Sequence, residues 1–224
     1  ENMTESHNRV MRTYYYGKVT LIDDGIGLIL KALEDRGLMD NTWIIYTSDH
    51  GEMLGDHRLS HKVVFYEGAL KIPCIVRPPE GGKGWESSAL TDQLDVAATI
   101  LDIGGAEPFE RSDGRSLVQN VRATPDTPDG HKGKEAVFSE VNLYSMVLTD
   151  RYKMAVNSLT REPLELYDMA DDPNELNNLV RDHSLKRVRD ELSERHISYL
   201  LGHLDEARLK VFQEDIAAAR RPRA

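Results

Sequence analysis

Nine consecutive residues read Trp43-Ile44-Ile45-Tyr46-Thr47-Ser48-Asp49-His50-Gly51, and their pattern carries most of the information on the fold class. The first five are apolar or β-branched, which predicts a short strand buried on both faces. Polar residues and a glycine follow, so the strand stops where chemically active side chains begin. Because open α/β sheets bind ligands at the carboxyl ends of their strands, this run also locates a candidate site.

A long helix is predicted before this strand, over Glu5–Asp35. Six apolar residues recur three or four positions apart, which places them on one helix face; they are Val19, Ile22, Ile26, Ile29, Leu30 and Leu33. Gly37 is expected to end the helix. A helix that leads into a buried strand favours an α/β fold.

A second apolar run, Ile72–Val76, is expected to form a strand beside Trp43–Thr47, with the helical residues Tyr14–Asp35 flanking this sheet. Pro73 cannot donate to a strand ladder, which limits it to an edge, a bulge or the strand's start. Cys74 is the only cysteine of the chain. It can form no internal disulfide, and its place in the apolar run predicts packing in the core.

The second half of the chain predicts a smaller, separate layer. Residues 109–134 are polar and rich in Pro, Gly and Asp, which favours a long surface connection. We assign residues 1–122 to a large α/β domain and residues 123–224 to a small subdomain. The elements expected around the connection are a helix over Asp95–Ile103, strands Ala136–Val141, Tyr144–Leu148 and Lys153–Val156 in one antiparallel sheet, and a helix over Leu185–Ala219.

Charge and hydropathy exclude several partners. The 28 Lys and Arg residues stand against 38 Asp and Glu, a net charge of −10 that repels a phosphate backbone, so nucleic acid is not an expected partner. No apolar run approaches the roughly eighteen residues of a membrane span. The first thirty residues lack the pattern of a signal peptide. Since the chain opens at Glu1 rather than Met, we expect it to be part of a longer protein.

The polar residues after the first strand are the best site candidates. Asp49 supplies a hard anionic oxygen, and His50 supplies a neutral nitrogen or a hydrogen-bond donor. Gly51 allows a ligand to approach the backbone closely. From residue types alone, a simple turn capped by Asp49 and His50 explains the pattern equally well.

Several motifs, in order, resemble the sulfatases of the alkaline phosphatase superfamily. The similarity covers about residues 14 to 180. It rests on Tyr14-Tyr15-Tyr16-Gly17-Lys18-Val19, Thr47-Ser48-Asp49-His50-Gly51-Glu52, Leu54-Gly55-Asp56-His57 with Lys62, Ile72-Pro73-Cys74-Ile75-Val76-Arg77, Asp95-Val96-Ala97-Ala98-Thr99-Ile100-Leu101-Asp102, Thr149-Asp150-Arg151-Tyr152-Lys153, and Glu165-Leu166-Tyr167-Asp168 with Asp171-Asp172-Pro173. This resemblance implies an alkaline phosphatase-like mixed sheet sandwiched by helices, followed by a small C-terminal antiparallel sheet with a helix.

The same resemblance implies roles for particular residues. Asp49 would ligate a divalent cation, expected to be calcium, and His50 would ligate it or hydrogen-bond a sulfate oxygen. Lys62 would contact the sulfate and the leaving oxygen, where a positive charge stabilises the transition state. His57 and His61 are weaker candidates for substrate contact, because loop histidines are commonly surface residues.

One departure from the family pattern matters as much as the match. Sulfatases use a formylglycine made from Cys or Ser in a Cys/Ser-x-Pro-x-Arg motif, and this sequence has none. The chain is therefore expected to be the C-terminal half of a sulfuric ester hydrolase, inactive alone, whose partner is its own N-terminal half. The alternatives are a phosphonate monoester or phosphodiester hydrolase, and a non-catalytic module. The alcohol of the sulfate ester, the compartment (cytoplasmic or periplasmic) and homo-oligomer formation stay open.

Overall fold

The structure, a computed structural model, describes residues 4–203 and divides them into two compact units. One unit contains the chain up to Ser87 together with Gln119–Gly130. The other contains Ser88–Val118 together with the residues from His131 onward. The domain boundary after residue 122 stays a prediction. The part of the predicted C-terminal helix beyond His203 lies outside the described residues.

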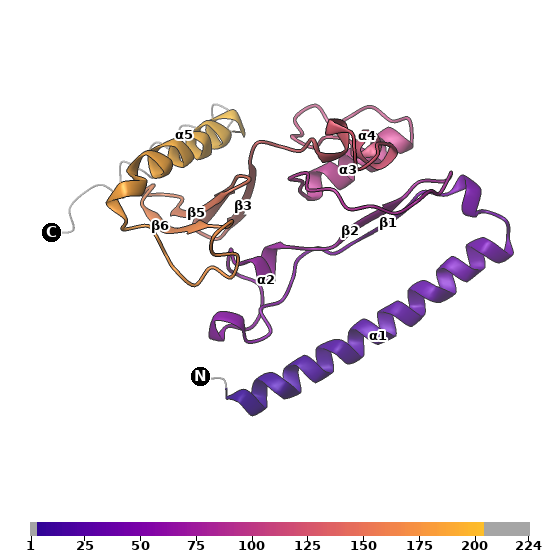
Figure 1. Cartoon of the computed structure of the whole chain (residues 1–224), viewed down its shortest axis with the longest axis horizontal. Helices are drawn as coiled ribbons and strands as arrows, with labels where there is room; N and C mark the ends of the chain where they lie inside the picture. Colours follow the sequence, from indigo (N-terminus) through magenta and orange to yellow (C-terminus); the bar gives the residue numbers. More distant parts are fainter. Residues whose placement is uncertain (1–3, 204–224) are drawn as a thin grey trace. The chain divides into compact units, whose positions relative to one another are not determined.

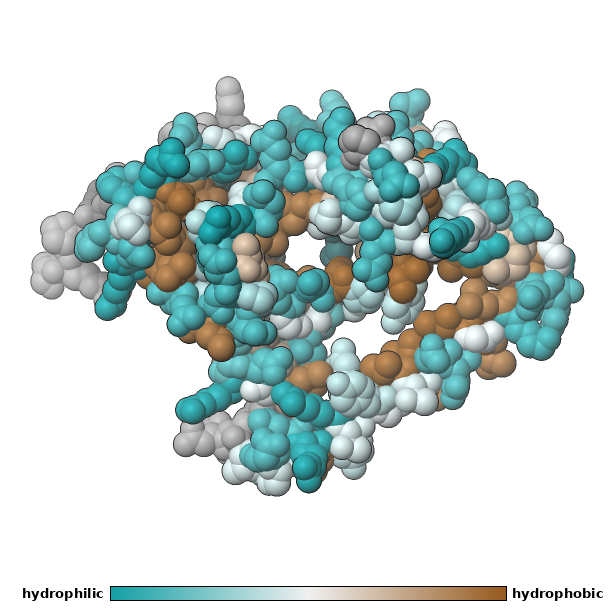
Figure 2. Space-filling model, viewed as in Figure 1, coloured by the Kyte–Doolittle hydropathy of each residue, from teal (hydrophilic) through white to brown (hydrophobic). Residues whose placement is uncertain are grey.

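Helix α1 spans Glu5–Asp35 in the first unit, as predicted (Figure 1). Thr4 caps it by accepting a hydrogen bond from the backbone N–H of His7, which satisfies one of the free amides of the first turn. Gly37 follows with a φ of 64°, a conformation that favours glycine after a helix end. None of the residues of α1 is buried, and many of its apolar side chains, among them Leu21, Leu28 and Ile29, are exposed along the helix (Figure 2).

Two antiparallel strands follow, β1 (Ile44–Thr47) and β2 (Cys74–Arg77), paired from Ile44 with Arg77 to Thr47 with Cys74. The prediction that they are neighbours is confirmed. The predicted burial on both faces is wrong for the described residues, since the side chain of Ile75 is 62% exposed. Cys74 is exposed too, so its predicted core role is wrong. Two strands cannot cover their own faces, and burial depends on what packs against them.

Short helices occupy the segments between these elements. The first unit contains the 3-10 turns η1 (Met39–Asn41) and η2 (Asp56–Arg58) and the helix α2 (Glu67–Leu70). The predicted surface connection over residues 109–134 contains α4 (Val118–Arg122) and the 3-10 turn η3 (Pro128–His131). A helix of five residues is too short to show a period of 3.6, so the sequence pattern did not reveal it.

In the second unit, helix α3 (Gln93–Ile103) confirms the predicted helix there. Asp92 and Asp95 form a reciprocal capping box at its first turn. The ammonium of Lys134 lies 2.5 Å from Asp92 Oδ2 and 2.9 Å from Asp95 Oδ1. The backbone N–H of Arg115 also donates to Asp95, at 2.8 Å. The start of α3 therefore ties three segments of this unit together.

The four-stranded antiparallel sheet forms the core of the second unit, in the order β3-β4-β5-β6. Its strands are β3 (Val137–Val141), β4 (Tyr144–Leu148), β5 (Tyr152–Asn157) and β6 (Pro163–Asp168), and they are followed by η4 (His183–Leu185) and helix α5 (Lys186–His203). Three of the strands match the prediction, whereas β6 was not predicted. The buried core consists of Val147, Met154, Val156, Leu166 and Leu192, the last from α5.

A buried ion pair adds to this core. Lys153 on β5 and Glu175, after β6, are both 2% exposed, and their charged atoms lie 2.6 Å apart. Breaking such a pair by removing one partner leaves a buried charge, which is strongly destabilising. The second unit therefore encloses apolar and charged side chains without help from outside the described residues.

Candidate functional site

The candidate site begins directly after β1, where the chain approaches another segment closely. The N–H of Gly51 donates to the carbonyl of Ala69 at 2.8 Å. A Cβ at position 51 would lie 2.1 Å from the carbonyl oxygen of Gly68, so only glycine fits there. This contact fixes the direction in which Asp49 and His50 leave the strand.

Asp49 presents an ionised carboxylate to solvent, with its side chain 82% exposed. Its Oδ1 accepts the backbone N–H of His50 at 3.0 Å. Desolvation alone would raise the pKa of Asp49, but the N–H of His50 and the nearby charges of His50 and Lys62 outweigh it. The pKa of Asp49 therefore lies below its usual range, which keeps the carboxylate charged and available to a cation.

His50 lies between a carboxylate and an ammonium. Its Nδ1 lies 2.8 Å from the carbonyl of Gly51, which can only accept, so Nδ1 carries the hydrogen. Its Nε2 lies 3.2 Å from Asp49 Oδ2 and is hydrogen-bonded to Lys62 Nζ. A neutral His50 accepts from Lys62 at Nε2, whereas a protonated one donates to Asp49. The structure thus brings Asp49, His50 and Lys62 together, as the sequence predicted.

The loop between Gly51 and Lys62 folds back on itself, which makes this convergence possible. Met53 N donates to the carbonyl of His61 at 3.1 Å, and Gly55 N donates to that of Leu59 at 2.9 Å. Gly55 has a φ of 95°. The non-glycine residues with positive φ in this loop are Leu54, His57, Arg58 and His61. Such strained backbone persists only when its surroundings hold it, and it is often found beside functional sites.

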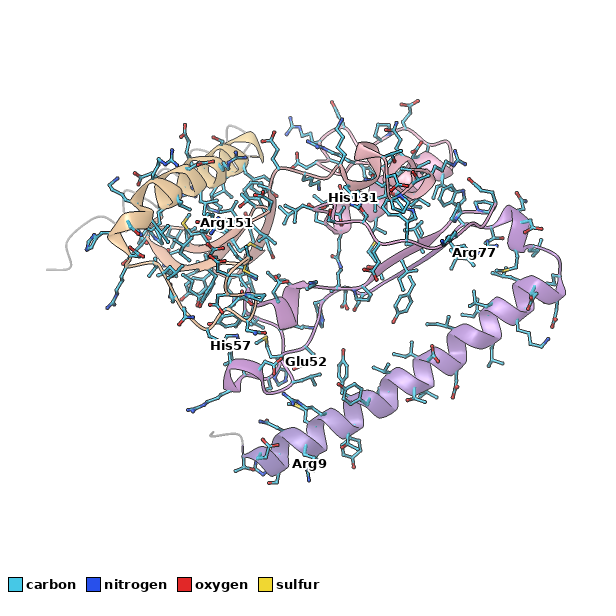
Figure 3. The ribbon with its side chains drawn as sticks, in the orientation of Figure 1. Arg9, Glu52, His57, Arg77, His131 and Arg151 are labelled. Carbon is cyan, nitrogen blue, oxygen red and sulfur yellow. The ribbon has the colours of Figure 1, made fainter. Side chains whose placement is uncertain are left out.

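The two other loop histidines make local contacts. His57 stacks on Tyr66, with ring centroids 3.9 Å apart, and Figure 3 shows it on the same loop as Glu52. His61 Nδ1 lies 3.0 Å from Ser60 Oγ. Contact of either histidine with a substrate stays a prediction.

Two further residues shape the loop, and the sequence did not assign them a role. Glu52 accepts a hydrogen bond from the backbone N–H of His61. Arg12 on α1 donates to the carbonyl of Leu54 at 2.8 Å and to Asp56 Oδ1 at 3.0 Å. Glu52 stands inside the motif quoted above, but its partner is nine positions away. A motif shows which residue types are present and not which atoms meet.

The donor set for a metal ion is incomplete within the described chain. Across residues 4–203, no group of three or more His, Cys, Asp and Glu side chains is placed to share an ion. The charged, exposed carboxylate of Asp49 fits one ligand position, and His50 adjoins it.

None of the helices described is long and apolar enough to cross a bilayer.

Comparisons with known proteins converge on one family. The family model described as Sulfatase matches residues 1–106, and the model described as N-sulphoglucosamine sulphohydrolase, C-terminal, matches residues 55–200. Arylsulfatase K of Xenopus laevis is 31% identical over 187 residues, which cover 79% of this chain and 35% of that protein.

Two solved structures also superimpose on most of this chain. The phosphonate monoester hydrolase of Agrobacterium radiobacter superimposes with a TM-score of 0.77 and 29% identity, over 91% of this chain and 44% of that one. A protein solved in complex with its substrate D-glucosamine-2-N,6-O-disulfate has a TM-score of 0.73 and 28% identity, over 85% of this chain and 40% of its own. The chain therefore spans less than half the length of these relatives.

Proposed function

This chain belongs to the sulfatase family, and from that premise we propose that it is the C-terminal portion of an enzyme that hydrolyses sulfate esters. One observation carries the proposal beyond family membership: Asp49, His50 and Lys62 meet at the end of β1. Their charges suit the anionic sulfate group of such an ester, held beside a cation. The nucleophile is a formylglycine expected outside this chain, since the sequence has no Cys/Ser-x-Pro-x-Arg motif.

The proposed chemistry follows from where charge develops. Hydrolysis breaks the bond between sulfur and the bridging oxygen, which leaves negative charge on that oxygen. The ammonium of Lys62 donates a hydrogen bond to it and stabilises the transition state more than the ground state. His50 holds Lys62 through Nε2, so the imidazole orients the ammonium toward the leaving group.

Sulfatases use a divalent metal ion, and we propose calcium at the carboxylate of Asp49. Calcium prefers about six to eight oxygen ligands, which is far more than this chain supplies. The remaining ligands would come from the same missing portion as the nucleophile. When bound, the ion would neutralise charge on the sulfate oxygens.

The proposed partner of the chain is the N-terminal portion of the same protein. The apolar side chains exposed on α1 and on β1 and β2, among them Ile22, Ile29 and Ile75, are the surface that it would cover. Exposed apolar surface of this extent commonly marks an interface. A sulfate ester is the proposed substrate, as in the glucosamine disulfate complex of one structural relative.

One observation favours a second candidate function. The phosphonate monoester hydrolase covers 91% of this chain, slightly more than the glucosamine disulfate complex does. A carboxylate-bound cation and an ammonium would serve a phosphonate or phosphodiester as well as a sulfate. Each of these esters presents anionic oxygens, and in each of them negative charge develops on the leaving oxygen during hydrolysis. Substrate profiling separates the two.

The proposal predicts a large loss of turnover for Lys62→Ala in the full-length protein. With an aryl sulfate as substrate, kcat should fall by about 100-fold to 1,000-fold, the size seen when one oriented donor is removed from a charged transition state. Steady-state kinetics on an aryl sulfate, an aryl phosphonate monoester and an aryl phosphodiester check both the residue and the substrate class.

Lys83→Ala is the matched control, because Lys83 is an exposed lysine of the same unit. Its kcat should stay within about twofold of the unaltered enzyme. Unchanged turnover for Lys62→Ala would refute the role of Lys62. Faster hydrolysis of the phosphonate than of the sulfate would favour the second function.

A further inference from the structure

The side chain of Glu52 clamps the backbone next to Lys62. Its Oε1 accepts the N–H of His61, while the N–H of the next residue, Met53, donates to the carbonyl of His61 at 3.1 Å. Both polar groups of the His61 backbone are therefore held by two adjacent residues. Figure 3 shows Glu52 at the base of this loop.

His61 needs such a clamp because its backbone is strained. Its φ of 72° lies in the left-handed region, which is unfavourable for a residue with a side chain. A change in the torsion angles of His61 would swing the following residue, Lys62, away from Nε2 of His50. The direction of the Lys62 ammonium thus depends on the conformation of His61.

Glu52 itself is firmly anchored on both sides. Gly51 is tied to Ala69 by a 2.8 Å hydrogen bond. Met53 is completely buried, and its sulfur packs against Gly68. The carboxylate therefore starts from a rigid part of the unit, and it can impose a geometry on the loop rather than follow it.

The other carboxylate of this loop lacks these properties. Asp56 pairs with Arg12 at 3.0 Å, and both side chains are exposed. Exposed ion pairs contribute little to stability. The two carboxylates thus provide a natural internal comparison.

We infer that Glu52 is a positioning residue, which fixes the backbone of His61 so that Lys62 is held toward the leaving group. The inference rests on the proposed function, because it gives Glu52 a task only if Lys62 acts on the substrate. Glu52 touches neither substrate nor cation in this role. It acts entirely through the loop.

The test measures kcat and KM of the full-length enzyme on aryl sulfates with leaving groups of different pKa. Glu52→Ala should lower kcat by about 10-fold to 100-fold, the cost of misplacing a catalytic group by about 1 Å, and leave KM within about threefold. The loss should grow with the pKa of the leaving group, as for Lys62→Ala. Glu52→Gln keeps an oxygen acceptor for His61 and should retain most of the activity.

The double variant gives the decisive comparison. Because Glu52 acts only through Lys62, Glu52→Ala combined with Lys62→Ala should be no slower than Lys62→Ala alone. Asp56→Ala is the matched control and should stay within about threefold of the unaltered enzyme. Melting temperatures of all variants identify any that lose the fold. If Glu52→Ala is among them, Glu52→Gln replaces it in the comparison with and without Lys62→Ala.

The outcomes separate the two proposals. Two outcomes would overturn the positioning role while leaving the proposed function intact. One is that the losses of kcat add in the double variant; the other is that the loss of kcat in Glu52→Ala does not depend on the pKa of the leaving group. Unchanged turnover in the Lys62→Ala variant, or a full-length enzyme without activity on any sulfate ester, would overturn the proposed function itself.

Discussion

The pair of strands β1 and β2 and the four-stranded sheet β3 to β6 bury their apolar residues very differently. In the sheet, Leu166 is fully buried and packs in a common core with Leu192 from α5. In the strand pair, Ile75 is 62% exposed, and α1 has no buried residue at all. Both strands of the pair and three of the four strands of the sheet, all except β6, were predicted from short apolar runs. Sequence pattern therefore indicates strands, whereas burial depends on the elements that surround them.

The candidate site lies on the less buried of these two regions. Asp49 and His50 follow β1, and Lys62 returns to them through a strained loop. The sheet of the second unit, in contrast, carries a buried ion pair and a closed core. We expect this division to separate stability from the proposed catalysis: the second unit should unfold as a self-contained core, and the first should gain its stability from the rest of the protein.

The largest effect expected on stability is that of Leu166→Ala. Truncation of a fully buried leucine leaves a cavity and should lower the free energy of unfolding by about 2–5 kcal/mol. Urea unfolding of the chain followed by circular dichroism measures it. A loss below about 1 kcal/mol would show that the second unit is not closed around this core.

Ile75→Ala is the counterpart in the strand pair. In the chain alone it should change the free energy of unfolding by less than about 0.5 kcal/mol, as for an exposed side chain. In the full-length protein the same change should cost more, because the proposed N-terminal portion would cover β2. If Ile75→Ala changes the free energy of unfolding by the same small amount in both proteins, the N-terminal portion does not cover β2.

A pH-dependent effect is expected from His196 in the second unit. Burial, and secondarily the charge of Arg161, lower the pKa of His196 from 6.5 to about 4. The folded state thus keeps the ring neutral where the unfolded state binds a proton. The resulting stability is complete above pH 6.5 and is lost as the pH falls toward 4, by at most about 3 kcal/mol.

His196→Leu isolates this contribution, because leucine fills the buried site without a titrating group. Urea unfolding at pH 7, 5.5 and 4.5 should show a shallower acid loss for the variant than for the unaltered chain. Parallel curves would mean that His196 has no part in the acid sensitivity of the second unit.

The sequence predicted elements well where a pattern is long or bounded by strong signals. The helix α1 follows from six apolar residues at helical spacing and a glycine stop, and the convergence of Asp49, His50 and Lys62 follows from a motif with flexible glycines. β6 was missed because Pro163 precedes only a few alternating residues, which is a weak strand signal. Cys74 was misplaced because its exposure depends on partners that a local pattern does not reveal. The contact of Glu52 with His61 is invisible to any pattern, since it depends on loop conformation.

The most direct test of the account compares the 224-residue chain with the full-length protein on an aryl sulfate and an aryl phosphodiester, with calcium present. We predict turnover by the full-length protein and none by the chain alone, because the chain has no formylglycine motif and only Asp49 and His50 of a ligand set. Turnover by the chain at a rate like that of the full-length enzyme, abolished by Asp49→Ala, would contradict the account. It would place the nucleophile within these residues, with the exposed Cys74 or Ser60 as the first to examine.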